Sequence, residues 1–174
     1  MSAPLQVEAV ANWFLRTARK RGMRIDPMKM QKLVYFANGW HLALAGKPLV
    51  DEYFEAWEYG PVVPSVYHKF KGYGAGSIEG FATTFDWRSG TVSTPDVPDS
   101  HSVVPLLNWV WDNYGKYSGP VLSDLTHRPG EAWDRTRNEK ASYRNADIPP
   151  AYIEADFKRA LKLAQERAST NAGQ

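Results

Sequence analysis

Hydrophobic residues recur at steps of three and four between residues 28 and 44, which is the spacing of one face of an α-helix. Asp26 and Pro27 precede this stretch as an N-cap and a first-turn proline, and Gly46 follows it as a residue that can turn left-handed. We therefore predict a central helix of roughly 19 residues, apolar around most of its circumference. The pattern is carried by Met30, Leu33, Val34, Ala37, His41 and Leu44, with Met28, Tyr35 and Leu42 along one edge.

Further helices are expected on both sides of this one, bounded by capping residues, prolines and glycines. In the last of them Ile153, Phe157, Leu161 and Ala164 share one face, so we expect all four to pack on the core. Gly39 interrupts the central helix at a cost of about 1 kcal/mol relative to alanine, so we expect a close packing contact there. The additional helices run from Ser2 or Pro4 to Gly22, from Pro64 to Phe70, from Ser102 to Tyr114, from Ser118 to His127, from Pro129 to Arg137, and from Pro149 or Pro150 onward.

Two short stretches have the composition of β structure rather than helix. Tyr53 to Tyr59 is aromatic-rich and extended, and it stops at a corner formed by Gly60 and Pro61. Ile78 to Ser93 alternates threonine and aromatic residues around a turn, which predicts a small hairpin. We therefore predict an α+β fold, mainly α, with a single domain over residues 1–167 and a frayed C-terminal tail over residues 168–174.

The composition narrows the class of protein. The 174 residues are 43% hydrophobic and 13% aromatic, which is enough for one hydrophobic core. A net charge of +2 gives little support to nucleic-acid binding, and the absence of cysteine excludes disulfides and cysteine metal sites. We recognise no signal peptide and no uncharged apolar run of about 18 residues. We therefore expect a soluble, cytoplasmic protein that binds neither nucleic acid nor a membrane.

One small cluster has the residue types of a hydrolase. Ser123, Asp124 and His127 lie within one predicted helical turn, where a serine and a histidine four residues apart can hydrogen bond as nucleophile and base. A helical serine more commonly bonds its own backbone, and no nucleophile elbow or oxyanion donor accompanies the cluster. We therefore expect His127 and Trp133 to be structural, with hydrolysis kept as an alternative.

The other polar residues form no recognisable metal, cofactor or phosphate site. The four histidines lack the spacing of a metal-binding pair on a helix. The glycines between Lys71 and Gly76 lack the preceding strand and the Lys-Ser/Thr pair of a phosphate-binding loop. We expect no cofactor, and we expect Lys29 and Lys32 to be ordinary solvated lysines.

Aromatic residues crowd the segment before the glycine-proline corner. Tyr53, Trp57 and Tyr59 lie there with a phenylalanine, and the side chains of an extended segment alternate between two faces, so they cannot all enter one core. Exposed tyrosine and tryptophan beside a rigid corner have the composition of a protein-interface hot spot. In the alternative, a second layer that contains Trp109 and Trp111 covers them.

Two stretches carry a family resemblance. Residues 30–49, MQKLVYFANGWHLALAGKPL, and residues 54–67, FEAWEYGPVVPSVY, resemble the Panacea domain, also called the SocA-like antitoxin domain. The match continues downstream and covers about residues 7–133. We expect Trp57, Gly60 and Pro61 to hold the centre of the fold together with residues of the central helix. The residues of the family motif are Leu33, Tyr35, Phe36, Trp40, Ala56, Trp57, Tyr59, Gly60, Pro61, Val62, Leu122, His127 and Trp133.

The resemblance implies an antitoxin of a bacterial or phage-borne toxin–antitoxin module rather than an enzyme. It implies that the protein neutralises a cognate protein toxin, encoded by the adjacent gene, through direct contact. The alternative within the family is a proteolytic adaptor that delivers its toxin to a protease. Because members have unrelated partners, the partner-binding surface is expected to differ in part from the motif, and the basic end of the first helix at Arg16 is a second candidate. The partner-binding residues that we predict are Tyr53, Tyr59, Phe85 and Trp87.

Overall fold

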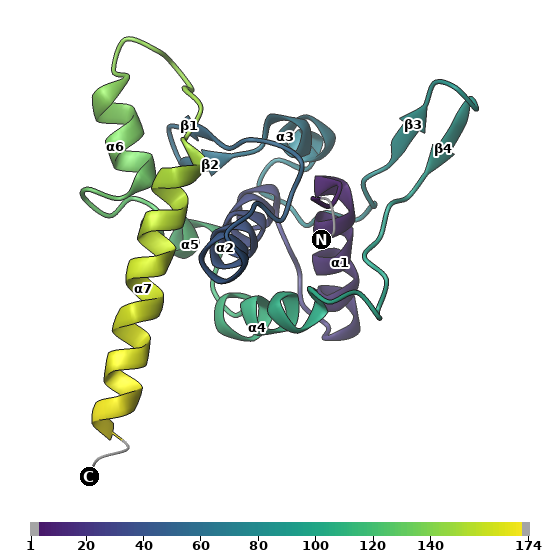
Figure 1. Ribbon diagram of the computed structural model, residues 1–174. Coiled ribbons are helices and arrows are strands. Elements are labelled where there is room, and N and C mark those ends of the chain that lie inside the picture. The colour runs from purple at the N-terminus through teal and green to yellow at the C-terminus, as the bar shows by residue number, and fades with distance from the viewer. Residues whose placement is uncertain (1–3, 172–174) are drawn as a thin grey trace.

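The computed structural model describes residues 4–171 and places α2 (Pro27–Ala45) at the centre of the fold (Figure 1). Two antiparallel hairpins, β1 (Glu55–Trp57) with β2 (Gly60–Val62) and β3 (Thr84–Asp86) with β4 (Thr91–Ser93), accompany the helices. The predicted α+β fold, mainly α, is confirmed. The other helices are α1 (Val7–Lys20), α3 (Pro64–Phe70), the 3-10 turn η1 (Lys71–Tyr73), α4 (Val104–Tyr114), α5 (Gly119–Leu125), α6 (Ala132–Glu139) and α7 (Pro150–Asn171).

The limits of α2 are set by its capping residues. The Asp26 side chain accepts a hydrogen bond from the Lys29 N–H at 2.9 Å, and Gly46 ends the helix with a φ of 66°. The predicted helix of 19 residues is confirmed, and it contacts α1, α3, α4, α5, α7 and β2. Leu44 belongs to the apolar face that the spacing predicts, but it is 61% exposed because residues 44–46 lie at the solvent-exposed end of the helix.

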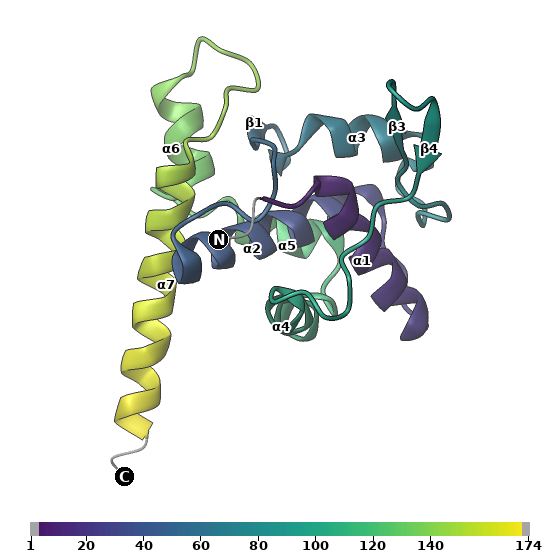
Figure 2. The ribbon, with the colours of Figure 1, turned by 45° about the vertical axis from the view of Figure 1, so that its right-hand side comes forward.

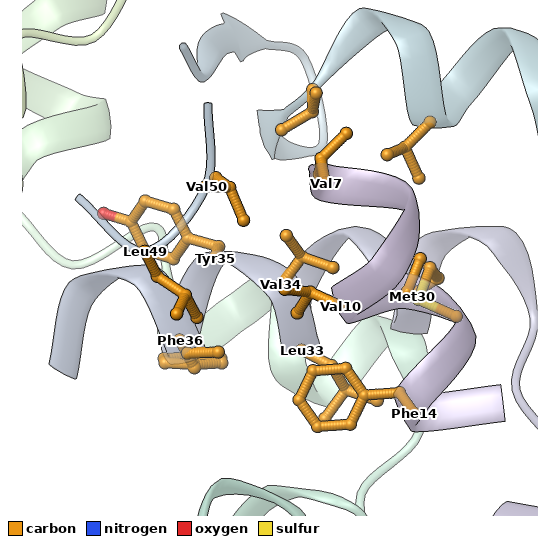
Figure 3. Close-up of a cluster of buried hydrophobic side chains, with 14 of the residues drawn as sticks. Val7, Val10, Phe14, Met30, Leu33, Val34, Tyr35, Phe36, Leu49 and Val50 are labelled. Atoms are coloured by element: carbon orange, nitrogen blue, oxygen red, sulfur yellow. The ribbon is translucent and has the colours of Figure 1, made fainter. Parts of the chain in front are cut away.

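The core forms where α1 lies beside the first half of α2 (Figure 3). Its side chains interdigitate between these two helices and the segment that follows α2. Burying one side chain of this size contributes about 1.5–3 kcal/mol, so the cluster holds the two helices together. The buried residues labelled in the figure are Val7, Val10, Phe14, Met30, Leu33, Val34, Tyr35, Phe36, Leu49 and Val50.

Gly39 makes the close contact that its place in the central helix predicts. A Cβ atom at this position would lie 2.2–2.5 Å from three ring carbons of Phe157, which is closer than any carbon contact allows. The partner is therefore α7. The Phe157 ring also lies 5.8 Å from the Tyr35 ring and 5.2 Å from the Trp40 ring, centroid to centroid. Because Gly39 has no side chain, this ring can pack directly against α2 and hold α7 there.

Only the first half of α7 packs as predicted. Ile153 and Phe157 are buried, whereas Leu161 is half-buried and Ala164 is exposed. The prediction is wrong for these last two residues because α7 continues past the body of the protein, as both ribbon views show (Figures 1 and 2). The helix extends to Asn171, beyond the residue at which we expected the tail to begin, and residues 172–174 lie outside the described part.

The first helix begins at Val7, later than predicted. Leu5 is instead extended and pairs in parallel with Val50, with its N–H donating to the Leu49 carbonyl at 2.8 Å. The Asp51 side chain accepts a hydrogen bond from the N–H of Val7 at 3.1 Å, which satisfies one of the free donors of the first turn. The predicted start at Ser2 lies outside the described residues.

The extended segment from Tyr53 does not end at Gly60. The chain reverses after Trp57, and Gly60 begins β2, which pairs with β1 in the register Trp57↔Gly60, Ala56↔Pro61. Residues 146–148 add a third short segment, with the Ala56 N–H donating to the Ala146 carbonyl at 2.8 Å. The second hairpin, predicted between residues 78 and 93, is confirmed in its outer part by β3 and β4.

Candidate functional site

The turn between β1 and β2, together with its flanks over residues 53–63, is called the β1–β2 corner from here on. Two side chains of α2 hold one side of it. The Lys32 ammonium donates to the Pro61 carbonyl at 3.1 Å. The Gln31 amide donates to the Val63 carbonyl at 3.2 Å and accepts from the Val63 N–H at 2.9 Å. Both side chains thus bind main-chain groups of the corner, which fixes its position without constraining the side chains that it displays.

Helices α5 and α6 hold the opposite side of the corner in the same way. The Ser123 hydroxyl donates to the Tyr59 carbonyl at 2.8 Å, and the Trp133 indole N–H donates to the Trp57 carbonyl at 2.7 Å. The Arg137 guanidinium donates to the Ala56 carbonyl at 3.0 Å. The structure therefore brings the downstream part of the sequence motif, on α5 and α6, next to the part at residues 54–67. The two parts are joined by hydrogen bonds from side chains to main-chain carbonyls of the corner, which are called clamps below.

Gly60 is required at the corner for two separate reasons. Its φ of 102° lies in a region that only glycine adopts readily. A Cβ atom there would also lie 2.7 Å from the Lys32 Nζ and 2.7 Å from the Thr126 hydroxyl. The corner can therefore close onto α2 and α5 only because this residue has no side chain.

The prediction that Lys29 and Lys32 are solvated lysines is wrong. Both are buried, with exposed fractions of 5% and 1%. The Lys29 ammonium donates to the Gly115 carbonyl at 2.5 Å, and desolvation by burial lowers the pKa of Lys29 against a smaller opposing effect of Asp26. Burial also lowers the pKa of Lys32, to about 7. Each buried ammonium thus has a main-chain carbonyl as a hydrogen-bond acceptor.

The stability of the protein relative to a Lys32→Met variant is expected to rise with pH from about 7 to 10.5. Over this range an unfolded chain still binds a proton at residue 32, whereas the folded chain with its lowered pKa does not. The unfolded state therefore binds more protons, and the difference in unfolding free energy grows by roughly 1.4 kcal/mol per pH unit. Urea denaturation of both proteins across this range measures it, and parallel pH profiles would contradict the burial of this amine.

Ser123 and His127 do not form a nucleophile–base pair. The Ser123 hydroxyl is directed at the Tyr59 carbonyl, and the His127 Nδ1 lies 2.6 Å from the Ser123 carbonyl oxygen rather than from its hydroxyl. His127 Nε2 faces the Glu58 carbonyl at 3.3 Å, and its ring lies 3.9 Å from the Trp133 ring, centroid to centroid. These contacts join both rings to main-chain groups of the β1–β2 corner, and the structural role of His127 and Trp133 stays a prediction.

Trp57 does not occupy the centre of the fold, contrary to our expectation. It is half-buried, its indole N–H donates to the Glu55 carboxylate at 2.6 Å, and its ring lies 4.8 Å from the Tyr67 ring. The residue of this segment that enters the core is Phe54, whose ring lies 5.3 Å from the Tyr35 ring. Side chains alternate between the two faces of an extended segment, and Phe54 and Trp57 are an odd number of positions apart, so they point to opposite faces. Phe54 therefore enters the core while Trp57 does not.

The four predicted partner-binding aromatics are all exposed, with fractions of 67% for Tyr53, 63% for Tyr59, 45% for Phe85 and 88% for Trp87. They do not form one patch, because α3 lies between the β1–β2 corner and the β3–β4 hairpin in both ribbon views (Figures 1 and 2). The alternative second layer does not cover them. Trp111 is buried beside Phe14 and Trp109 packs on Trp40.

The basic end of α1 is largely engaged within the chain. Arg16 pairs with Asp96, Arg19 donates to the Glu79 carbonyl, and both guanidinium groups lie over the Phe81 ring. Among residues 4–171, no group of three or more potential ligand side chains is arranged to hold a metal ion. Within the same range no helix has the length and hydropathy that crossing a membrane requires.

The sequence did not predict that Gln31, Lys32 and Arg137 hold the main chain of the β1–β2 corner. One signal for Lys32 was available, since Met28 and Phe36 lie one turn before and after it on a helix that is apolar almost all round. A lysine between two apolar residues on the same face of a central helix is expected to be buried. Arg137 gives no comparable signal, because its acceptor is a carbonyl far away in sequence.

Comparison with known proteins matches the elements that build the corner. The family model described as antitoxin SocA-like, Panacea domain, matches residues 30–134, which include most of α2, both strands of the corner, α5 and Trp133. Antitoxin SocA of Caulobacter vibrioides (strain NA1000 / CB15N) is 36% identical over 134 residues, which cover 77% of this chain and 71% of that protein. No solved structure gives a significant match. The chain therefore belongs to the SocA-like antitoxin family that the Panacea domain defines.

Proposed function

We propose that the protein is the antitoxin of a two-gene module and that it neutralises a cognate protein toxin in the cytoplasm by binding it directly. Its family supports an antitoxin role and implies a toxin partner. Direct binding is supported by one observation above all, the exposure of large aromatic side chains at the β1–β2 corner and on the β3–β4 hairpin. The proposed action requires no catalysis.

The β3–β4 hairpin carries Trp87, the most exposed of the four aromatics. Trp87 packs edge-on against Phe85, with 4.6 Å between the ring centroids, and Val92 is 66% exposed directly opposite Phe85 in the register of the hairpin. Tryptophan and other aromatics that become desolvated on binding contribute disproportionately to interface affinity. An apolar group of this kind on a projecting hairpin is therefore suited to a protein partner.

The β1–β2 corner carries the other two exposed aromatics on a backbone that is held by hydrogen bonds. Tyr53 and Tyr59 point into solvent, while the Tyr59 carbonyl is held by Ser123. A side chain on a fixed backbone loses less conformational freedom on binding than one on a mobile loop. This separation lets the exposed residues differ between family members while the clamps beneath them stay the same.

Tyr59→Ala and Trp87→Ala are each expected to abolish rescue of cells that express the toxin from the adjacent gene. Each change should weaken binding by about 2 kcal/mol or more, which is roughly thirtyfold in the dissociation constant, with little change in melting temperature. Leu163→Ala is the control, because Leu163 is 48% exposed on the projecting half of α7. Co-expression rescue and calorimetric titration of folded variants measure the effect.

Full rescue and unchanged affinity in both aromatic variants would place the partner surface elsewhere, first of all at the basic end of α1. The same cells also distinguish sequestration from delivery to a protease. Sequestration leaves the toxin intact in a stable complex with the antitoxin, whereas an adaptor lowers the amount of toxin in a protease-dependent way. We expect a stable complex, because the display of rigid anchors favours a long-lived contact.

A further inference from the structure

A cavity of about 870 Å³ opens beside the β1–β2 corner. Its walls come from the start of α2, the corner, α3, α6 and the loop that follows α6. This volume lies within the range of roughly 300–1,000 Å³ that small-molecule sites occupy. The cavity is distinct from the exposed tips of Phe85 and Trp87, which do not line it.

Positive charge dominates the lining of this cavity. Arg137 and Arg144 contribute guanidinium groups to it, and Glu58 is the acidic residue there. Within residues 4–171, neither of these two arginines has a carboxylate within ion-pair distance. Arg137 is also held in place, because it donates to the Ala56 carbonyl and its guanidinium lies 5.3 Å from the centre of the Trp133 ring. The cavity therefore favours a negatively charged group.

Aromatic and apolar side chains form another wall. The Trp57 and Tyr67 rings lie 4.8 Å apart with a tilt of 58°, and the bond from the Trp57 indole to Glu55 fixes the orientation of that ring. Met28 and Val62 extend the apolar surface. Flat ring systems pack well against such surfaces, in offset-stacked or edge-on arrangements.

We propose that this cavity binds a small planar organic anion, with its ring against Trp57 and Tyr67 and its carboxylate or phosphate group toward Arg137 and Arg144. The proposal does not depend on the identity of the toxin. It gives the antitoxin a second site, one wall of which is the proposed anchor Tyr59, so a small molecule and a protein partner can influence each other's binding.

Two matched pairs of probes test this site by calorimetry and ligand-detected NMR on the full chain. Indole-3-carboxylate is compared with neutral indole-3-carboxamide, and AMP is compared with adenosine. The two comparisons show whether the cavity prefers a carboxylate or a phosphate group. A fragment of this size is expected to bind with a dissociation constant of about 1 mM or lower. In at least one pair the anion is expected to bind roughly tenfold more tightly than its neutral partner.

Arg144→Ser should remove most of this preference for the anion, and Arg144→Lys should restore part of it. Arg144 is exposed, so the fold is not expected to change, and Arg24→Ser is the control because Arg24 is an arginine outside the cavity. Equal binding of charged and neutral probes, or no binding of any probe at several times the expected constant, would overturn the proposal. So would a loss of toxin affinity in Arg144→Ser without binding of any probe, because the cavity would then belong to the protein interface.

Discussion

Replacing Gly39 by leucine is expected to lower the free energy of unfolding by roughly 3–5 kcal/mol, the range that loss of a buried aromatic produces. The new Cβ would lie 2.2–2.5 Å from three carbons of the Phe157 ring, so the ring must leave its site. Phe157 fills the space between Tyr35, Phe36 and Trp40, and its displacement separates α7 from α2. Urea denaturation of the variant measures the effect.

Gly72→Ala is the control for this experiment, because a Cβ atom at Gly72 would meet nothing within 4 Å and the residue has no positive φ. A second control is the double variant Gly39→Ala with Phe157→Leu. The smaller ring-free side chain makes room for the new methyl group, so the two changes should be less costly together than the sum of their separate costs. A leucine at residue 39 that leaves stability unchanged would show that α7 is not seated on this glycine.

Replacing Gly60 by valine is expected to destabilise the protein by roughly 2–5 kcal/mol and to abolish rescue from the toxin. A non-glycine residue is strained at a φ of 102°, and the new side chain would push against the Lys32 ammonium and the Thr126 hydroxyl. Because Tyr59 is the preceding residue, movement of the corner displaces this anchor as well. Thermal unfolding and the rescue assay report the two effects separately.

Gly90→Ala separates conformational strain from crowding. Gly90 has a φ of 68° and nothing within 4 Å of a Cβ position, so its substitution costs only the left-handed conformation, about 1–2 kcal/mol. Gly60→Ala should cost clearly more than this, since it adds the close contacts with α2 and α5. If both substitutions lowered the free energy of unfolding by the same amount, the close contacts of Gly60 with Lys32 and Thr126 would contribute nothing to stability.

The parts of the fold that could be predicted from the sequence depend on local signals. Asp26 and Gly46 cap α2 through bonds to residues within one turn, so their effect is visible in the residues themselves. Gly39 is a similar case, because a costly glycine within a helix indicates a close neighbour, although it does not say which. The neighbour, Phe157, lies more than 100 positions away and could be identified only from the structure.

For the β1–β2 corner, the sequence showed which residues belong to the motif. It did not show how these residues are arranged in space. Its clamps join side chains to carbonyl oxygens that lie 29 residues apart for Lys32 and Pro61 and 81 residues apart for Arg137 and Ala56. Every residue has a carbonyl group, so the sequence does not show which ones are bound. The burial of Lys32 and the reversal of the chain before Gly60 follow from these long-range bonds.

Calorimetric titration of the purified chain with the protein encoded by the adjacent gene tests whether this protein neutralises its toxin by direct contact. We predict saturable binding with a dissociation constant below about 1 μM, weakened roughly thirtyfold by Tyr59→Ala or Trp87→Ala and unchanged by Leu163→Ala. If the wild-type chain rescues cells from that toxin but gives no binding heat and no complex on gel filtration, direct neutralisation is contradicted.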